Sequence, residues 1–139
     1  MNIVEHANDF CINYLNCIKK ASKDLWITQS QALCIQSIPY DGISQTDLSK
    51  KLFLDLSTLS RNLDKLIKLN LIEKTIAPLD KRSYKIYLTK RGKTLYQDLN
   101  NKINFYFQDI YSELGFKKVD DLADILSAIN WQFEILHNE

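Results

Sequence analysis

The chain has 139 residues, of which 45% are hydrophobic and 25% charged, and its formal net charge is +1, so it has the composition of one folded domain and not of a disordered segment. Its three glycines cannot form a glycine-rich phosphate loop, its two histidines lie near opposite ends, and its three cysteines form no Cys-x-x-Cys pair, so we expect no enzyme, no metal site and no cofactor. No apolar run approaches the roughly 18 residues of a membrane span, and Glu5 and Asp9 stand where a signal peptide would be basic and then apolar, which predicts a cytoplasmic protein with no membrane partner.

The first predicted element is an amphipathic helix over about residues 2–23. Apolar and small residues recur along it at the spacing of one helix face: Ile3, Ala7, Phe10, Cys11, Tyr14, Ile18 and Ala21. Such a face must be covered in the folded protein. His6 in this helix and His137 near the other end are interpreted as solvated, because no cysteine or carboxylate pair accompanies them.

A short second helix is predicted over about residues 29–38. Thr28 and Gln31 have the spacing of a capping box, in which each side chain bonds an unpaired amide at the helix start. Pro39 then ends the segment, and Asp41-Gly42 indicates a turn.

A third short helix is predicted to follow this turn. Ser44 and Asp47 resemble a second N-terminal cap, and Leu48, Leu52 and Phe53 are expected on the buried side.

The fourth predicted helix starts after Asp55, which is expected to cap it. Its buried side is expected to comprise Leu56, Leu59, Leu63, Leu66, Ile67 and Asn70. At 100° per residue, the opposite direction is occupied by Ser57, Thr58, Arg61, Lys65 and Lys68. We therefore expect an exposed face made of hydrogen-bond donors and cations.

The periodicity then changes to that of strands. Residues 72–77 are predicted as a strand, residues 78–83 as a turn and residues 84–88 as a second strand with alternating side chains. This pattern predicts a β-hairpin with a basic tip.

Two long helices are predicted to complete the chain. Thr89 can cap a helix whose apolar residues are Leu95, Leu99, Ile103, Tyr106, Ile110 and Leu114, widened by Tyr96, Phe105, Phe107 and Tyr111. Gly115 and Phe116 interrupt this pattern, and a last helix bearing Trp131 follows, with Val119, Leu122, Ile125, Leu126, Ile129, Phe133 and Leu136 as its apolar residues. So much apolar surface on extended helices indicates a partner chain.

The charge is divided unevenly along the chain. Between Ser44 and Lys93 there are twelve lysines and arginines and five aspartates and glutamates, a net charge of +7, so the remainder of the chain carries −6. A basic centre flanked by acidic ends is the asymmetry expected of a nucleic-acid-binding module.

Two short helices followed by a hairpin with a basic tip predict a winged helix-turn-helix within a mainly α (α+β) fold. The major groove of DNA admits one α-helix, and a hairpin tip carrying arginine can reach the neighbouring backbone or minor groove. The alternative is a helical module that uses the same scaffold only for protein contact, although such an interface favours apolar anchors over cations.

At these positions the sequence resembles the MarR family (multiple antibiotic resistance regulators). The resemblance rests on residues 56–66, on Asp80-Lys81-Arg82-Ser83, which is similar to the family's Asp-x-Arg signature, and on residues 88–92 at the start of the next helix. It covers nearly the whole chain, with helices before and after the winged module in the family's order.

The resemblance implies a single domain over residues 1–139, in which residues of about 28–93 form the winged helix-turn-helix and those of about 1–25 and 94–139 form dimerisation helices. It implies a homodimer that binds a pseudo-palindromic operator in double-stranded DNA and regulates transcription. Repression in this family is commonly relieved by a small-molecule effector bound between the dimer region and the winged module.

Carried over residue by residue, the resemblance assigns DNA contacts to three places. The predicted recognition helix would face DNA with Ser57, Thr58, Ser60, Arg61, Asn62 and Lys65. Arg82 would enter the minor groove with Asp80 positioning it and Lys81 and Ser83 beside it, and Ser44 and Gln45 would meet phosphates.

Two further alternatives concern cysteine and aromatic side chains. Cys11 is either a packed thiol or, by similarity to the peroxide-sensing branch of the family, a reactive sensor of a redox-regulated protein. Trp26, Tyr14 and Trp131 either line an effector pocket or belong to the core.

Overall fold

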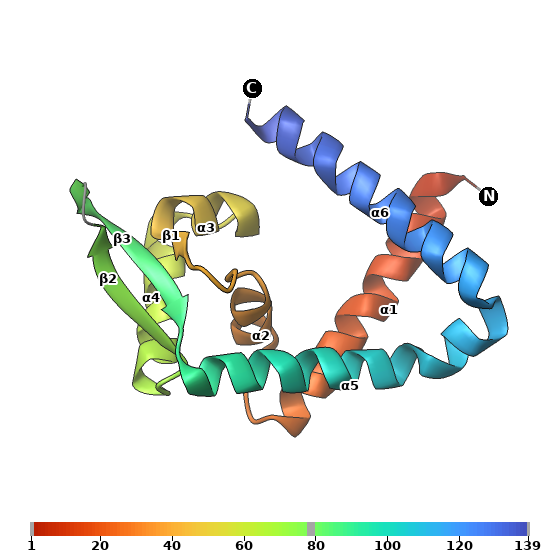
Figure 1. Ribbon diagram of the computed structural model, residues 1–139, viewed down its shortest axis with the longest axis horizontal. Helices are drawn as coiled ribbons and strands as arrows, with labels where there is room; N and C mark the ends of the chain where they lie inside the picture. Colours follow the sequence, from red (N-terminus) through yellow and green to blue (C-terminus); the bar gives the residue numbers. More distant parts are fainter. Residues whose placement is uncertain (1, 78–79, 139) are drawn as a thin grey trace. The chain divides into compact units, whose positions relative to one another are not determined.

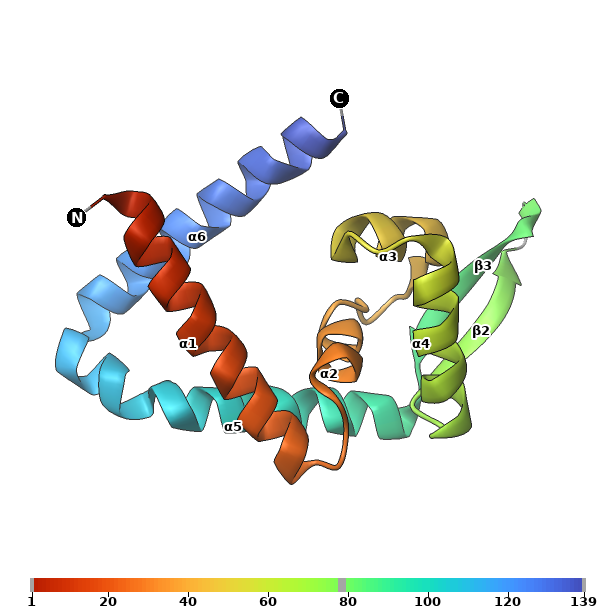
Figure 2. The same ribbon diagram turned by 180° about the vertical axis from the view of Figure 1, so that it is seen from behind.

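The computed structural model describes residues 2–77 and 80–138, and the side chains of residues 77 and 80–83 lie outside the described set. The chain forms two compact units, Met1–Ile103 and Asn104–Glu139. Figure 1 shows the order of the elements, and Figure 2 shows the same ribbon from behind.

The first unit contains the predicted winged module. Its helices are α1 (Ile3–Asp24), α2 (Gln29–Gln36), α3 (Gln45–Leu52), α4 (Leu56–Lys68) and the first part of α5 (Lys90–Leu114). Its strands are β1 (Ile43–Ser44), β2 (Ile72–Ala77) and β3 (Asp80–Leu88), which form an antiparallel sheet in the order β1-β3-β2. The hairpin and α4 lie side by side in both ribbon views.

Side-chain caps fix the starts of the short helices. The Thr28 hydroxyl accepts a hydrogen bond from the Gln31 amide at 3.1 Å, and the Gln31 side chain accepts one from the Thr28 amide at 2.9 Å, which confirms the predicted capping box. Ser44 caps α3 and Asp55 caps α4, as predicted, each by accepting a hydrogen bond from the amide three residues ahead. Local polar residues therefore determine where α2, α3 and α4 begin.

The core of the first unit is built from one side of each element. Its fully buried leucines and isoleucines come from every helix and from β3: Ile18, Ile35, Leu48, Leu59, Leu63, Leu66, Ile86 and Leu99. Cys34 is buried among them, and desolvation raises the pKa of its thiol to about 12, so it stays protonated and unreactive.

Some residues expected inside the molecule are exposed. Phe53 is 73% exposed and has a φ of 54°, because it forms the left-handed turn that ends α3. Leu56 is 52% exposed and Ile67 39% exposed, and Asn70 lies in a turn with a φ of 59° beyond the end of α4. The buried side of α4 is therefore narrower than predicted and consists of Leu59, Leu63 and Leu66.

The hairpin begins its second strand earlier than expected. Residues 72–77 form β2 as predicted, but β3 starts at Asp80, four residues before the predicted start, and a register shift between Ile76 and Ala77 pairs Ala77 with Asp80. The predicted turn at residues 78–83 is thus partly strand, and residues 78 and 79 lie outside the described residues.

The second unit contains the end of α5 and all of α6 (Phe116–His137). Gly115 joins the two helices with a φ of 83°, a conformation that only glycine adopts readily. No described residue of α6 is buried, although the helix carries the predicted apolar residues. Among the described helices, none is long and apolar enough to cross a membrane.

Candidate nucleic-acid interface

The start of α3 is fixed by the wing and by its own cap. Ser44 lies in β1 opposite Lys85 of β3, and its hydroxyl accepts a hydrogen bond from the Asp47 amide at 3.0 Å. Ser44 and Gln45 are both half-buried. The first turn of α3 therefore has a defined position relative to the wing, and its free amides point toward any anion placed beyond the helix start.

The start of α4 is organised around Asp55. Its Oδ1 accepts hydrogen bonds from the Thr58 amide at 2.7 Å and from the Ser57 hydroxyl at 2.8 Å. The bond from the Thr58 amide contributes most, and these bonds lower the pKa of Asp55 to about 2. The carboxylate is therefore ionised at neutral pH, and it holds the hydroxyl of Ser57 in place.

The exposed side of α4 presents a row of charged and hydroxyl groups. We call this the outward face, and its members are Ser57, Arg61, Asp64, Lys65 and Lys68, all exposed. Arg61 Nη2 donates a hydrogen bond to Thr58 Oγ1 at 3.4 Å, and Thr58 is half-buried. The guanidinium keeps further donors with which it can bind a base edge or a phosphate.

Asp64 was not among the predicted contacts. It is exposed within the outward face, where only donors and cations were expected. Its angle on the helix lies about 20° from Ser57 and about 60° from Arg61, so a helical projection alone would have placed it there. The face therefore combines three cations with one carboxylate.

Two other predicted contacts lie on the flanks of α4. Ser60 and Asn62 are half-buried, and Asn62 Nδ2 donates a hydrogen bond to Ser30 Oγ of α2 at 3.3 Å. Asn62 thus braces α4 against the start of α2. The structure brings Ser57, Arg61 and Lys65 together on one surface and places Ser60 and Asn62 at its margins.

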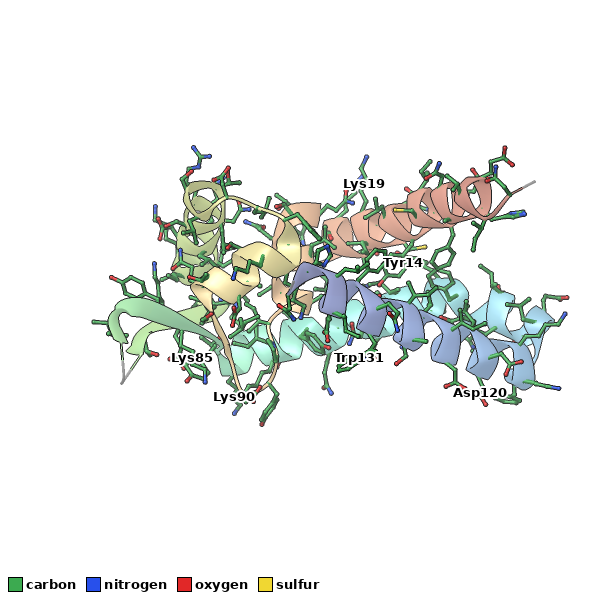
Figure 3. All side chains as sticks on the ribbon, turned by 90° about the horizontal axis from the view of Figure 1, so that it is seen from above. Tyr14, Lys19, Lys85, Lys90, Asp120 and Trp131 are labelled. Atoms are coloured by element: carbon green, nitrogen blue, oxygen red, sulfur yellow. The ribbon has the colours of Figure 1, made fainter. Side chains whose placement is uncertain are left out.

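The wing adds cations at its described base. The Lys74 ammonium lies 4.2 Å from the ring centre of Tyr84, and the Lys85 ammonium lies 5.3 Å from that of Tyr87. Figure 3 shows the Lys85 side chain on β3. The backbone of residues 80–83 begins β3, but the predicted side chains of Asp80, Lys81, Arg82 and Ser83 lie outside the described residues.

The remaining candidates do not join this surface. Cys11 is exposed on α1 and therefore does not pack inside the first unit. Trp26 is 94% exposed with a φ of 62°, and Trp131 is 61% exposed, so neither belongs to a core. Among the described residues, no group of three or more histidine, cysteine, aspartate or glutamate side chains could hold a metal ion.

Sequence comparison matches the winged module to one protein family and most of the chain to one transcriptional regulator. Residues 27–83 match the sequence model of the MarR family. The HTH-type transcriptional regulator SarZ of Staphylococcus epidermidis is 27% identical over 128 residues, which cover 85% of this chain and 84% of SarZ.

Solved structures of the same fold are similar over almost the whole chain. Wild-type MarR from E. coli has a TM-score of 0.78 at 23% identity, covering 93% of this chain and 96% of MarR. NadR in complex with 4-hydroxyphenylacetate has a TM-score of 0.78 at 20% identity, covering 93% of this chain and 92% of NadR. The mainly helical winged fold predicted from the sequence is thereby confirmed.

Proposed function

We propose that the chain, whose residues 27–83 match the MarR family model, is a transcriptional regulator of that family that binds a pseudo-palindromic operator as a homodimer. The observation that carries this proposal is the outward face of α4, where Arg61, Lys65 and Lys68 are exposed together. A helix with such a face fits the major groove, and its cations release counterions from the phosphates. A regulator of this kind acts on DNA in the cytoplasm.

The proposal gives each part of the interface a role. Arg61 reads a base edge, with Ser57 and Thr58 near the start of the helix, where major-groove contacts concentrate. Lys65 and the first turn of α3 at Ser44 and Gln45 bind phosphates and set the register. Ser60 and Asn62 support the edges of the contact, and Arg82 with Asp80, Lys81 and Ser83 reaches the minor groove.

The proposed homodimer would cover apolar surface that each protomer leaves exposed. In α1, Ile3 is 80% exposed, and in α6 no described residue is buried. A second copy is the partner that a regulator with a two-fold symmetric operator requires. Sedimentation of the purified chain at micromolar concentration tests this part, because a monomer would overturn it.

We further propose that the protein is a repressor that a small molecule releases from DNA. NadR, which has the same fold, was solved with 4-hydroxyphenylacetate bound. Transcription from a promoter that contains the selected operator, compared with and without the regulator, distinguishes repression from activation.

The decisive experiment selects bound sequences from random duplex DNA with the full-length protein. The expected product is a pseudo-palindrome with half-sites about 10 base pairs apart or a multiple of that spacing. Its affinity should fall steeply with salt, because cationic contacts release counterions. Failure to enrich any sequence, or an affinity for DNA that does not change with salt concentration, would favour the alternative of a protein-interaction module.

A further inference from the structure

The hydroxyl of Ser57 has a defined polarity. Its oxygen lies 2.8 Å from Asp55 Oδ1, and it donates its proton to that carboxylate oxygen. The direction is fixed because an ionised carboxylate only accepts hydrogen bonds, and the pKa of Asp55 is lowered to about 2, first by the bond from the Thr58 amide. A hydroxyl has one proton and two lone pairs, so only the acceptor side of Ser57 is left for a ligand.

The oxygen of Ser57 is open to such a ligand. Ser57 is the second residue of α4, and it is exposed, as is Asp55 before the helix. Within the described part of the chain, no group donates a hydrogen bond to this oxygen. Side chains near the start of a recognition helix are those that contact base edges in the major groove. Ser57 therefore provides an unused acceptor where base contacts are expected.

The neighbouring hydroxyl has the opposite polarity. Thr58 Oγ1 accepts a hydrogen bond from Arg61 Nη2 at 3.4 Å, so one of its lone pairs is engaged and its proton remains to be donated. The guanidinium of Arg61 has donors only. Of these three side chains, Ser57 is the one that offers no donor to DNA.

The charge beside Ser57 disfavours a phosphate as its partner. A phosphate oxygen accepts hydrogen bonds, so it would need the proton that Asp55 already holds. The phosphate would also lie only two hydrogen-bond lengths, each about 2.8 Å, from the Asp55 carboxylate. Like charges at that separation repel each other, so the partner of Ser57 is expected to be a donor without negative charge.

The major groove offers two donors of this kind. They are the N6 amino group of adenine and the N4 amino group of cytosine. Guanine presents the acceptors N7 and O6 there, and thymine presents the acceptor O4 and a methyl group. An acceptor without a donor therefore distinguishes adenine and cytosine from guanine and thymine. The bond to the carboxylate also makes the Ser57 oxygen a stronger acceptor, because linked hydrogen bonds polarise one another.

We propose that Ser57 is a specificity-determining residue that accepts a hydrogen bond from a base amino group in the major groove, N6 of adenine or N4 of cytosine. Asp55 acts through Ser57 by holding its proton and is a positioning residue. The inference rests on the proposed function, because it specifies the chemistry of one contact made by the recognition helix.

The test uses the full-length protein and the operator selected from random duplex DNA. Each adenine of a half-site is replaced in turn by 2-aminopurine, which lacks the N6 amino group and still pairs with thymine. Each cytosine is replaced by 2-pyrimidinone, which lacks the N4 amino group. At one position the analogue should weaken binding by the wild type about tenfold, since the Ser57 acceptor then has no partner. The identity of that base distinguishes adenine from cytosine.

A double-mutant cycle assigns this loss to Ser57. Ser57→Ala should weaken binding to the unmodified operator about tenfold, and the analogue at that position should then cost nothing further. Any effect of the analogue on base pairing is the same for both proteins and cancels in the cycle. If the losses from Ser57→Ala and from the analogue are independent at every position, no amino group bonds Ser57 and the proposal is overturned.

Thr58→Val is the matched control in the same helical turn. It keeps the shape of the side chain and removes a hydroxyl that offers a donor. It should retain the full tenfold sensitivity to the analogue at the Ser57 position, about the factor expected for one lost bond. Loss of that sensitivity in Thr58→Val would contradict the proposal, because the effect would then belong to the helix start in general.

Asp55→Ser tests what sets the polarity of Ser57. Serine caps a helix about as well as aspartate, so α4 should begin at the same residue. A serine hydroxyl can donate to Ser57 and leave the Ser57 proton free, so the preference at this base should relax to include guanine or thymine. Selection with the variant measures the preference, and the base read by Arg61 should stay the same. An unchanged preference for the amino-bearing base would argue against the role of the Asp55 carboxylate.

Failure of this inference and failure of the proposed function give different results. A protein that enriches no sequence from random DNA would overturn both. A protein that binds its selected operator, but shows no position at which Ser57→Ala and an analogue are coupled, would overturn the inference alone.

Discussion

The Thr89 hydroxyl donates a hydrogen bond to the Asn70 carbonyl at 2.7 Å and accepts one from the Gly92 amide at 3.0 Å. It thereby joins the turn after α4 to the first turn of α5, and the Thr89 amide adds a bond to the Leu71 carbonyl at 3.1 Å. The predicted cap of α5 thus has a second role, because it fixes the end of the proposed recognition helix to the helix that leaves the winged module.

Gly92→Ala should destabilise this junction. A Cβ at Gly92 would collide with the Leu71 carbonyl oxygen, and Leu88 Cβ lies 3.4 Å away on another side. Because backbone atoms must move to admit the methyl group, we expect a loss of about 1–3 kcal/mol in the free energy of unfolding. Arg91→Ala, an exposed neighbour on α5, should change it by less than about 0.5 kcal/mol. Denaturant unfolding measures the stability of both variants. Equal unfolding midpoints for Gly92→Ala and the wild type would refute the predicted collision.

Arg61→Ala should weaken operator binding by about 1–3 kcal/mol and relax base preference at one position of each half-site. The reason is that the exposed guanidinium can form a bidentate bond to a guanine edge from the middle of the outward face. Comparison of the sequences selected by the wild type and the variant measures the change. If affinity falls equally on all sequences, Arg61 contacts only phosphate.

Asp64→Asn should strengthen binding to random-sequence DNA by about threefold to tenfold. The exposed carboxylate repels phosphates, and it can favour cytosine by accepting a bond from its amino group. The ratio of operator to random-sequence affinity should therefore fall. Asp98→Asn, which removes an exposed carboxylate from α5, is the control for net charge, and an equal gain in that variant would argue against a role for Asp64 at the interface.

Asp55→Ala should lower stability at neutral pH but not in strong acid. Hydrogen bonds to the ionised carboxylate lower the pKa of Asp55 from 3.8 to about 2. The stabilisation is therefore complete above about pH 4 and is lost as the pH falls toward 2, where the folded protein also binds the proton. Unfolding of both proteins across this range should show a difference that shrinks with acid. A difference that stays constant would mean that the ionised cap contributes nothing.

Helix starts could be predicted from the sequence because they depend on neighbours in the chain. Thr28, Ser44 and Asp55 each bond an amide three residues ahead, so a local pattern contains all the information needed. The side of α4 that faces the core could be predicted for a similar reason, because three buried leucines lie on one side at helical spacing.

The edges of the buried side of α4 could not be predicted in the same way. Leu56 and Ile67 lie about 50° and 70° from the mean direction of Leu59, Leu63 and Leu66 at 100° per residue. Whether such marginal positions are covered depends on which element packs beside them. The exposure of Phe53 could not be predicted because this residue itself adopts the left-handed conformation that ends α3. Lys51 and Lys93, 42 positions apart in the sequence, line the same cavity, and no local pattern indicates this.

Arg82 has its backbone near the start of β3, and the sequence resemblance gives its side chain a role in the minor groove. An arginine on a wing is favoured in a narrow minor groove, where the negative potential is enhanced. Arg82→Ala should therefore reduce operator affinity and lower the slope of its salt dependence by about one phosphate equivalent. Arg82→Lys should recover only part of the loss, because an ammonium is more strongly hydrated and lacks the planar guanidinium.

Salt titrations of operator affinity for the three proteins provide the measurement, with sedimentation to verify that the oligomeric state is unchanged. Base preference at the centre of each half-site should persist in both Arg82 variants, since α4 and not the wing would read it. Arg61→Ala should show the opposite pattern, because it relaxes the base preference at one position of each half-site. Indistinguishable slopes and affinities for the wild type and both Arg82 variants would mean that the wing does not touch DNA, and that the similarity of Asp80 and Arg82 to the family signature has no counterpart in binding.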